Sequence, residues 1–139
     1  MRYYLDTNML VFILLNPKSD DISREAADII FDYSNILYAS SVAVNELILL
    51  YKTGKVTLSD CKSAEDIISG MKRYGIEIVY YNQYHLEKYI ALDLIDGHKD
   101  MNDHAIIAQA IADKIPLVSS DTKFHCYTGQ GLDFVFNRR

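Results

Sequence analysis

Short apolar stretches that favour β-strands alternate along the chain with longer stretches whose apolar residues recur at helical spacing. The predicted strands are 2–5, 36–39, 76–81, 116–119 and a short fifth, 134–136. The predicted helices are 9–15, 22–33, 41–53, a stretch from Ser59-Asp60 to Met71, 82–95 and 102–114. A strand, a helix and a second strand normally form a crossover that leaves the two strands parallel. The alternation therefore predicts an α/β sandwich, with helices covering both faces of a mostly parallel sheet of four to five strands.

Helix starts are predicted from side chains that accept a hydrogen bond from the free N–H groups of a first turn. Asp20 and Asp21 are the candidates for the helix over 22–33, Ser41 for 41–53, and Ser59-Asp60 for the helix that follows. The helix over 102–114 is apolar on nearly every side, so we expect it to be buried.

The chain length of 139 residues is that of one domain, and we expect a single domain over 1–139. Half of the residues are hydrophobic and 24% are charged, which is typical of globular proteins and leaves little room for disorder. Acidic residues outnumber Lys and Arg by 19 to 14, for a net charge of −5. This balance excludes the broad basic surface with which most DNA-binding domains hold phosphates, so any nucleic-acid contact must depend on a local feature.

Cellular location is predicted from the cysteines and from the longest apolar run near the start of the chain. Cys61 and Cys126 are too few for a disulfide framework and lack metal-ligand spacing, which favours reduced core thiols. The apolar run from Met9 to Leu15 is too short to span a bilayer, and no small-residue cleavage site follows it. We therefore expect a cytoplasmic protein with no membrane segment.

Acidic residues stand where two predicted strands end. Asp6 follows the first strand and Asp121 follows the fourth. In open α/β sheets ligands bind outside the carboxyl ends of the strands, so both are candidates for a binding site. Each has a structural alternative, because aspartate is also common as a helix cap or turn residue.

Two further carboxylates belong to predicted helices. On a helical wheel Glu46 points away from the polar side that contains Asn45 and toward apolar neighbours, so it needs a partner such as a base, a proton or a cation. Asp103 opens the buried helix over 102–114, and Asp100 is either its cap or an additional acidic group. The alternatives are a salt bridge or a position at the rim of the apolar face for Glu46, and a favourable helix-dipole interaction for Asp103.

A parallel sheet brings strand ends and helix starts to one edge, where these carboxylates would repel one another. A divalent cation would relieve that repulsion. Oxygen ligands favour Mg²⁺ or Mn²⁺ over zinc, and such cations typically pair with phosphate oxygens. The chemistry indicated is therefore phosphoryl or phosphodiester chemistry.

Four motifs carry a family resemblance along essentially the whole chain. They are Leu5-Asp6-Thr7-Asn8, Val44-Asn45-Glu46-Leu47, His98-Lys99-Asp100-Met101-Asn102-Asp103 and Leu117-Val118-Ser119-Ser120-Asp121-Thr122-Lys123-Phe124. In order and spacing they resemble the PIN-domain nucleases, most closely the VapC-type toxins of bacterial type II toxin–antitoxin pairs. The resemblance implies a three-layer α/β/α sandwich, Mg²⁺ or Mn²⁺ at the acidic cluster, and endonucleolytic RNA cleavage by a metal-activated water that leaves 5′-phosphate and 3′-hydroxyl ends.

The resemblance also implies roles for individual residues. Its acidic quartet is Asp6, Glu46, Asp103 and Asp121, with Asp6 and Asp103 favoured as direct ligands. Glu46 or Asp121 would orient the water or hold a second metal. Supporting polar groups are Asn8, Asp100, Ser119, Ser120 and His104.

The chain departs from the family pattern between Asp100 and Asp103, at residue 104 and at residue 120. Many relatives have Pro-Phe between the two aspartates that correspond to Asp100 and Asp103, and Arg after the second, where this chain has Met101-Asn102 and His104. His104 is a candidate to replace the Arg in part, and Lys123 is a second candidate for a phosphate contact. Ser120 stands where Thr is frequent.

Relatives usually dimerise and are blocked by an antitoxin, so the expected partners are RNA, an antitoxin protein and a second copy of the chain.

Two other functions compete with this hypothesis. Asp6-Thr7 after a strand also resembles the nucleophile motif of haloacid-dehalogenase-like phosphatases, but Asn8 stands in place of the second aspartate. The other alternative is a catalytically inactive PIN-like module that binds RNA or protein, for which the replacement of Arg by His104 is the main argument.

Overall fold

Five parallel strands form the central sheet in the order β3-β2-β1-β4-β5. The computed structural model describes residues 1–139, and its strands are β1 (Arg2–Leu5), β2 (Ile36–Ser40), β3 (Ile76–Val79), β4 (Leu117–Ser119) and β5 (Phe134–Phe136). The predicted fifth strand is therefore present. The sheet is entirely parallel rather than mostly parallel, because every connection crosses over through a helical segment.

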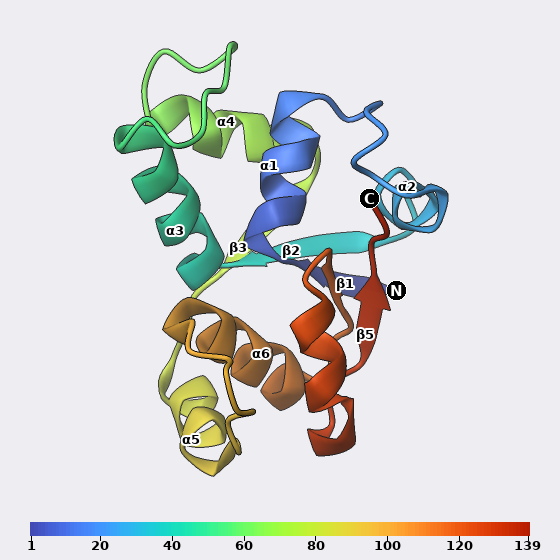
Figure 1. Ribbon diagram of the computed structural model, residues 1–139. Helices are drawn as coiled ribbons and strands as arrows, with labels where there is room; N and C mark the ends of the chain where they lie inside the picture. Colours follow the sequence, from blue (N-terminus) through green and yellow to red (C-terminus); the bar gives the residue numbers. More distant parts are fainter.

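Helices cover both faces of this sheet (Figure 1). One layer contains α1 (Thr7–Leu15), α2 (Arg24–Ile30), α3 (Ser41–Lys52) and α4 (Glu65–Arg73). The other contains α5 (Gln83–Ala91), α6 (Met101–Asp113) and the 3₁₀ segment η1 (Thr122–Gln130). The three-layer α/β/α sandwich expected from the sequence is confirmed.

The hydrophobic core is one cluster of buried side chains contributed by the strands and by helices of both layers. Leu5 of β1, Ile13 of α1 and Ile107 of α6 have no exposed surface. As its all-round apolar sequence predicts, α6 is buried continuously from His104 to Ala112. Strand β1 pairs with both β2 and β4, so the residue that follows it emerges at the middle of the sheet's carboxyl edge.

Several predicted helix boundaries are corrected by the structure. Helix α2 begins after Ser23, whose side chain accepts from Ala26 N–H, so Asp20 and Asp21 are not its caps. Ser40 rather than Ser41 caps α3. Helix α4 begins at Glu65 without a side-chain cap, because residues 59–63 form turns and bends.

The C-terminal half differs from the sequence prediction in three ways. Helix α5 ends at Ala91 instead of continuing to residue 95. The segment η1 was not predicted, since its apolar residues are sparse. Both cysteines are free thiols, but Cys126 is exposed and so is not the core thiol that we expected.

None of the helices is both long and apolar enough to cross a membrane.

Candidate active site

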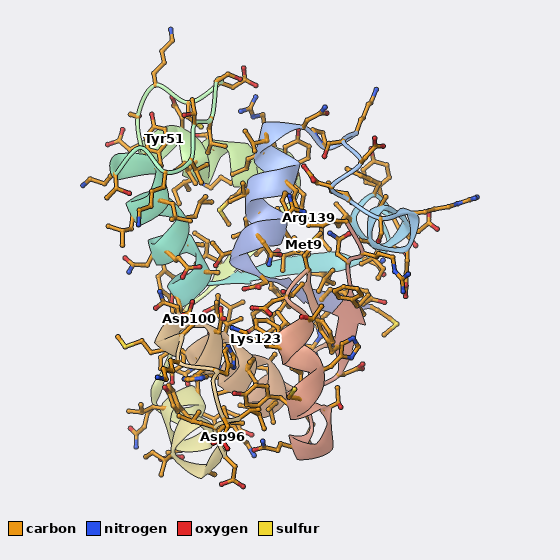
Figure 2. The ribbon with its side chains drawn as sticks, in the orientation of Figure 1. Met9, Tyr51, Asp96, Asp100, Lys123 and Arg139 are labelled. Carbon is orange, nitrogen blue, oxygen red and sulfur yellow. The ribbon has the colours of Figure 1, made fainter.

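Carboxylates gather in a pocket of about 320 Å³ at the carboxyl edge of the sheet. Figure 2 labels Asp100 at the start of α6 and Arg139 beside α1, two residues of its wall. The lining residues are Asp6, Thr7, Asn8, Val11, Phe12, Glu46, Leu50, Asp100, Asp103, Asp121 and Arg139. The structure thus brings together all four members of the predicted acidic quartet, with Asp100 as a fifth carboxylate.

Asp6 stands between β1 and α1, and only 3% of it is exposed. Its Oδ1 accepts from Thr7 N–H at 2.8 Å, and its Oδ2 accepts from the Ser119 hydroxyl at 2.7 Å and from the Asn8 amide at 3.2 Å. Asp6 is therefore a helix cap as well as a wall of the pocket. Burial raises its pKa to about 7, and the charges of Asp103 and Glu46 add to the effect while the Ser119 hydrogen bond opposes it.

The side chains of Asn8 and Ser119 both donate hydrogen bonds to Oδ2 of Asp6. The Asn8 amide nitrogen lies 3.3 Å from Ser119 Oγ, and its Oδ1 accepts from Ser120 N–H at 3.3 Å. The Ser120 hydroxyl is directed elsewhere, because it accepts from the Asn137 amide at 2.7 Å. Asn8 and Ser119 thus contact the carboxylate directly, whereas Ser120 contributes its backbone.

Asp103 occupies the first turn of α6. Burial raises its pKa to about 7, and repulsion by Asp100, Asp121 and Glu46 raises it further against the opposing effect of Lys123. Asp100 is the predicted cap of α6, since its Oδ1 accepts from the N–H groups of Asn102 and Asp103. Asp103 Oδ2 lies 3.0 Å from the Nε2 atom of His98.

Glu46 reaches the pocket from α3. Its Oε2 accepts from the amide of Asn102 at 2.9 Å, and no base is paired with it. The salt-bridge alternative is therefore absent. The predicted apolar setting is only partly correct, because Leu49 is 58% exposed and Glu46 itself lies beside the other carboxylates.

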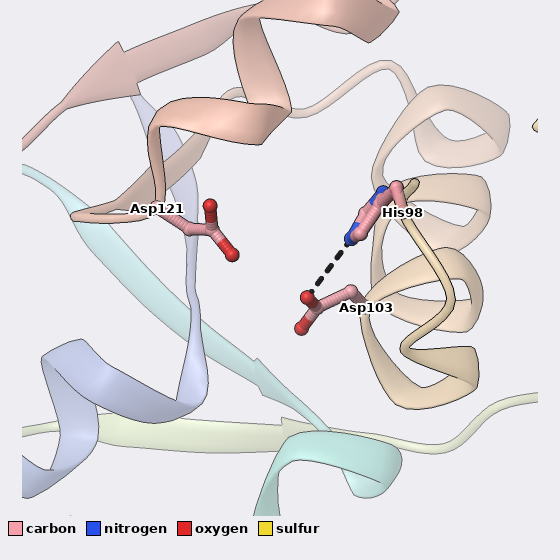
Figure 3. Close-up of side chains that lie close together, drawn as sticks. All are labelled: His98, Asp103 and Asp121. Atoms are coloured by element: carbon pink, nitrogen blue, oxygen red, sulfur yellow. Dashed lines mark hydrogen bonds and ion pairs between the residues drawn. The ribbon is translucent and has the colours of Figure 1, made fainter. Parts of the chain in front are cut away.

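Asp121 approaches from the opposite side, after β4. Its Oδ1 accepts from Lys123 N–H, so it caps η1, and its own N–H donates to Ser119 Oγ at 3.0 Å. One ligand atom each of His98, Asp103 and Asp121 lie within 4.8 Å of one another (Figure 3). His98 was not a candidate from the sequence. Its only signal was a histidine five residues before Asp103 in a predicted loop.

His104 does not reach this pocket. Only 3% of it is exposed, and its ring nitrogens are used by the backbone oxygen of His98 at 2.9 Å and the hydroxyl of Tyr89 at 3.2 Å. It is therefore not placed to substitute for an Arg that contacts phosphate. The basic residue that lines the pocket is Arg139, whose guanidinium lies 4.8 Å from the centre of the Phe12 ring and 3.2 Å from Asp21.

The residues of the pocket fit a bound divalent cation of the hard, oxygen-preferring kind. Its carboxylates outnumber its one basic side chain, Arg139, which is already paired with Asp21. Burial and the neighbouring carboxylates Asp103 and Glu46 raise the pKa of Asp6, and no cationic side chain is paired with it. A cation held by these oxygens would supply the missing positive charge, and Mg²⁺ and Mn²⁺ prefer such donors.

Comparisons with known proteins agree with this geometry. The PIN domain family model matches residues 3–129. The structure of VapBC2 from Rickettsia felis bound to a promoter DNA fragment is similar at 25% identity and a TM-score of 0.68, covering 99% of both chains. DNA-bound VapBC from Salmonella typhimurium (16% identity, TM-score 0.65) and VapBC-1 from nontypeable Haemophilus influenzae (18%, 0.62) each match over 98% of both chains and share the fold. No curated protein sequence matches significantly. The acidic edge, the all-parallel sandwich and the family match lead to one conclusion: the chain belongs to the PIN domain family.

Proposed function

We propose that this protein is a metal-dependent endoribonuclease and the toxin of a toxin–antitoxin pair. The observation that carries the proposal is the pocket itself, in which five carboxylates of a PIN domain converge while its one basic side chain, Arg139, is paired with Asp21. The similarity to VapBC structures supports the toxin assignment. Partners of the expected kinds are an RNA substrate, an antitoxin protein and a second copy of the chain.

Asp6, Asp103 and Asp121 would hold Mg²⁺ or Mn²⁺, with Glu46 as the fourth acidic group. When bound, the cation would lower the pKa of a coordinated water and offset the charge on the phosphate oxygens. The protein itself orients the carboxylates that would bind the cation. Ser119 and Asn8 hold Oδ2 of Asp6, and the Asn102 amide holds Glu46, so that these carboxylates face the pocket at fixed angles.

Glu46 and Asp121 are the two groups proposed to position the attacking water. Glu46 is held by a hydrogen bond to one oxygen, Oε2, and Asp121 uses Oδ1 to cap η1. Each therefore keeps a carboxylate oxygen without a hydrogen-bond partner. Such an oxygen can accept a proton from water or bind a second cation.

The direct test is RNA cleavage by the purified protein. We expect cleavage of structured RNAs in Mg²⁺, none in EDTA, and none by Asp6→Asn or Asp103→Asn. The matched control is Asp28→Asn, which changes an exposed carboxylate of α2 and should cleave as the wild type does. If wild-type protein cleaves no RNA in Mg²⁺, the nuclease proposal fails and a non-catalytic binding module takes its place.

The toxin assignment has its own test in cells. We expect expression of the wild-type chain to arrest growth and co-expression of the adjacent gene to restore it. Asp6→Asn should be harmless. Harmless expression of a protein that cleaves RNA in vitro would refute the toxin assignment while leaving the nuclease proposal intact.

A further inference from the structure

A buried chain of hydrogen bonds leads from the backbone of residue 95 to the acidic pocket. The N–H of Ile95 donates to the Tyr127 hydroxyl at 3.3 Å, and that hydroxyl lies 2.8 Å from Nδ1 of His98. On the other side of the ring, Nε2 of His98 lies 3.0 Å from Oδ2 of Asp103, as the dashed line in Figure 3 marks. Tyr127 has no exposed surface and His98 is 4% exposed, so these groups have little access to water.

The order of donors along this chain determines which ring nitrogen of His98 carries the proton. The Ile95 backbone nitrogen can only donate, so the Tyr127 oxygen accepts there. The Tyr127 hydroxyl hydrogen then needs an acceptor, and Nδ1 of His98 is the one within reach. The proton of the neutral ring is therefore on Nε2, where it donates to Asp103.

The opposite tautomer would be needed if His98 bound a cation directly through Nε2. A protonated Nδ1 would then point at the Tyr127 hydroxyl, leaving the hydroxyl hydrogen buried without an acceptor. Leaving a buried donor unpaired is costly, whereas a proton on Nε2 of His98 gives every donor in this series of hydrogen bonds an acceptor. The hydrogen bonds thus favour His98 as a donor to Asp103 over His98 as a ligand.

The ring of His98 is also held from its other sides. His104 stands edge-on to it with 4.7 Å between ring centres, and Phe124 packs at 6.2 Å. The Nε2 atom of His104 donates to the backbone oxygen of His98 at 2.9 Å, and Tyr89 contacts the other nitrogen of His104. His104 therefore lies behind His98 and restricts both its ring and its backbone.

We propose that His98 is a positioning residue of the acidic pocket, which holds Oδ2 of Asp103 through its Nε2–H. Tyr127 sets its tautomer, and the Oδ1 atom of Asp103 is left without a hydrogen-bond partner and available to a cation. Without that donor, repulsion by Asp100, Asp121 and Glu46 would act on an unrestrained carboxylate. This inference rests on the proposed function, because it requires that the pocket binds a divalent cation.

Nuclear magnetic resonance of the ¹⁵N-histidine-labelled protein measures the tautomer of His98 in the wild type. We expect a neutral His98 ring protonated at Nε2, both without metal and after addition of Mg²⁺. The signals are assigned by their loss in His98→Gln. A ring protonated at Nδ1, or a switch to that tautomer when Mg²⁺ is added, would overturn the proposal in favour of direct ligation.

Mn²⁺ affinity, measured by electron paramagnetic resonance, tests the positioning effect without RNA. Loss of a group that orients a metal ligand typically weakens metal binding about 10- to 100-fold, so we expect at least about tenfold from His98→Leu. His98→Gln keeps an N–H donor and should restore most of the affinity. Tyr127→Phe should weaken binding several-fold, and His125→Gln, an exposed histidine of η1, is the matched control.

The outcomes separate this inference from the proposed function. If the wild type binds no Mn²⁺, both proposals fail. If the wild type binds Mn²⁺ and folded His98→Leu and Tyr127→Phe bind equally well, the role of His98 alone is refuted. Thermal melting identifies a variant that does not fold, and the wild-type tautomer decides the matter if His98→Leu is such a variant.

Discussion

The hydroxyl of Ser119 donates a 2.7 Å hydrogen bond to Oδ2 of Asp6, although 113 residues separate them in sequence. The parallel pairing of β1 with β4 causes this contact, because it brings the carboxyl ends of both strands to one edge. The contact joins two of the four motifs. It also opposes the effect of burial on the pKa of Asp6.

Ser119→Ala should shift the pH dependence of metal binding to higher pH. The variant removes a hydrogen bond that lowers the pKa of Asp6, so that pKa should rise above its value of about 7. A hydrogen bond to a charged group contributes about 1.5–3 kcal/mol, so Mn²⁺ affinity near neutral pH should fall about tenfold or more and recover at higher pH. Ser34→Ala, which removes an exposed serine bonded to Asp32, is the control. Superimposable pH profiles for wild type and Ser119→Ala would contradict this account.

In the wild type, metal affinity should rise as the pH increases through about 7 and level off above it. The pKa values of Asp6 and Asp103 are both raised to about 7, and a proton on either carboxylate competes with the cation. Binding below this pH should therefore release protons. Calorimetry in buffers of different ionisation enthalpy measures that release. An affinity independent of pH across this range would show that the two carboxylates are already ionised.

The metal-free protein should become less stable as the pH rises from about 4 to about 7. Asp6 has a pKa of 3.8 as a free side chain and about 7 in the fold, so across this range the folded state binds more protons than the unfolded state. The free energy of unfolding then falls with increasing pH. Mg²⁺ should reverse the loss, because the cation binds the ionised carboxylates of the folded state.

Asp6→Asn tests the same linkage by substitution. In EDTA above neutral pH the variant should be more stable than the wild type, by about 1–3 kcal/mol, since it removes a buried charge that has no partner. Near pH 5 the advantage should disappear, because Asp6 is then protonated. Denaturant unfolding at both pH values measures the difference, with Asp28→Asn as a control that should show none. If Asp6→Asn is less stable than the wild type at the higher pH, the buried charge of Asp6 does not destabilise the metal-free protein.

Arg139 and His104 should differ in their effect on RNA binding. Arg139 lines the pocket and is solvent-exposed, whereas both ring nitrogens of His104 have partners in the interior. Removing one phosphate contact lowers the slope of log affinity against log salt by about 0.7 for single strands, so Arg139→Ala should show that change. His104→Gln should leave the slope unaltered. The measurement is RNA affinity as a function of salt in Ca²⁺ or another cation that does not support cleavage. A lower slope for His104→Gln would reinstate it as the phosphate contact.

The sequence by itself determined the class of fold and the acidic residues. The spacing of apolar residues along the sequence predicts the alternating strands and helices. The all-round apolar sequence of α6 requires burial wherever the helix packs. Asp6 and Asp121 are recognisable because each stands just past the end of a strand, and parallel strands end at a common edge. These features depend on neighbours in the chain, so one sequence is enough to find them.

Only the tertiary structure decided which distant groups serve the carboxylates. His98 contacts Asp103 because a loop turns back over α6, His104 points to Tyr89 rather than the pocket, and Arg139 reaches the pocket beside Phe12. No periodicity encodes these contacts, since each depends on the packing of elements from different parts of the chain. The physical reason is that burial and hydrogen-bond partners are set by neighbours in space, and those exist only once the sheet has assembled.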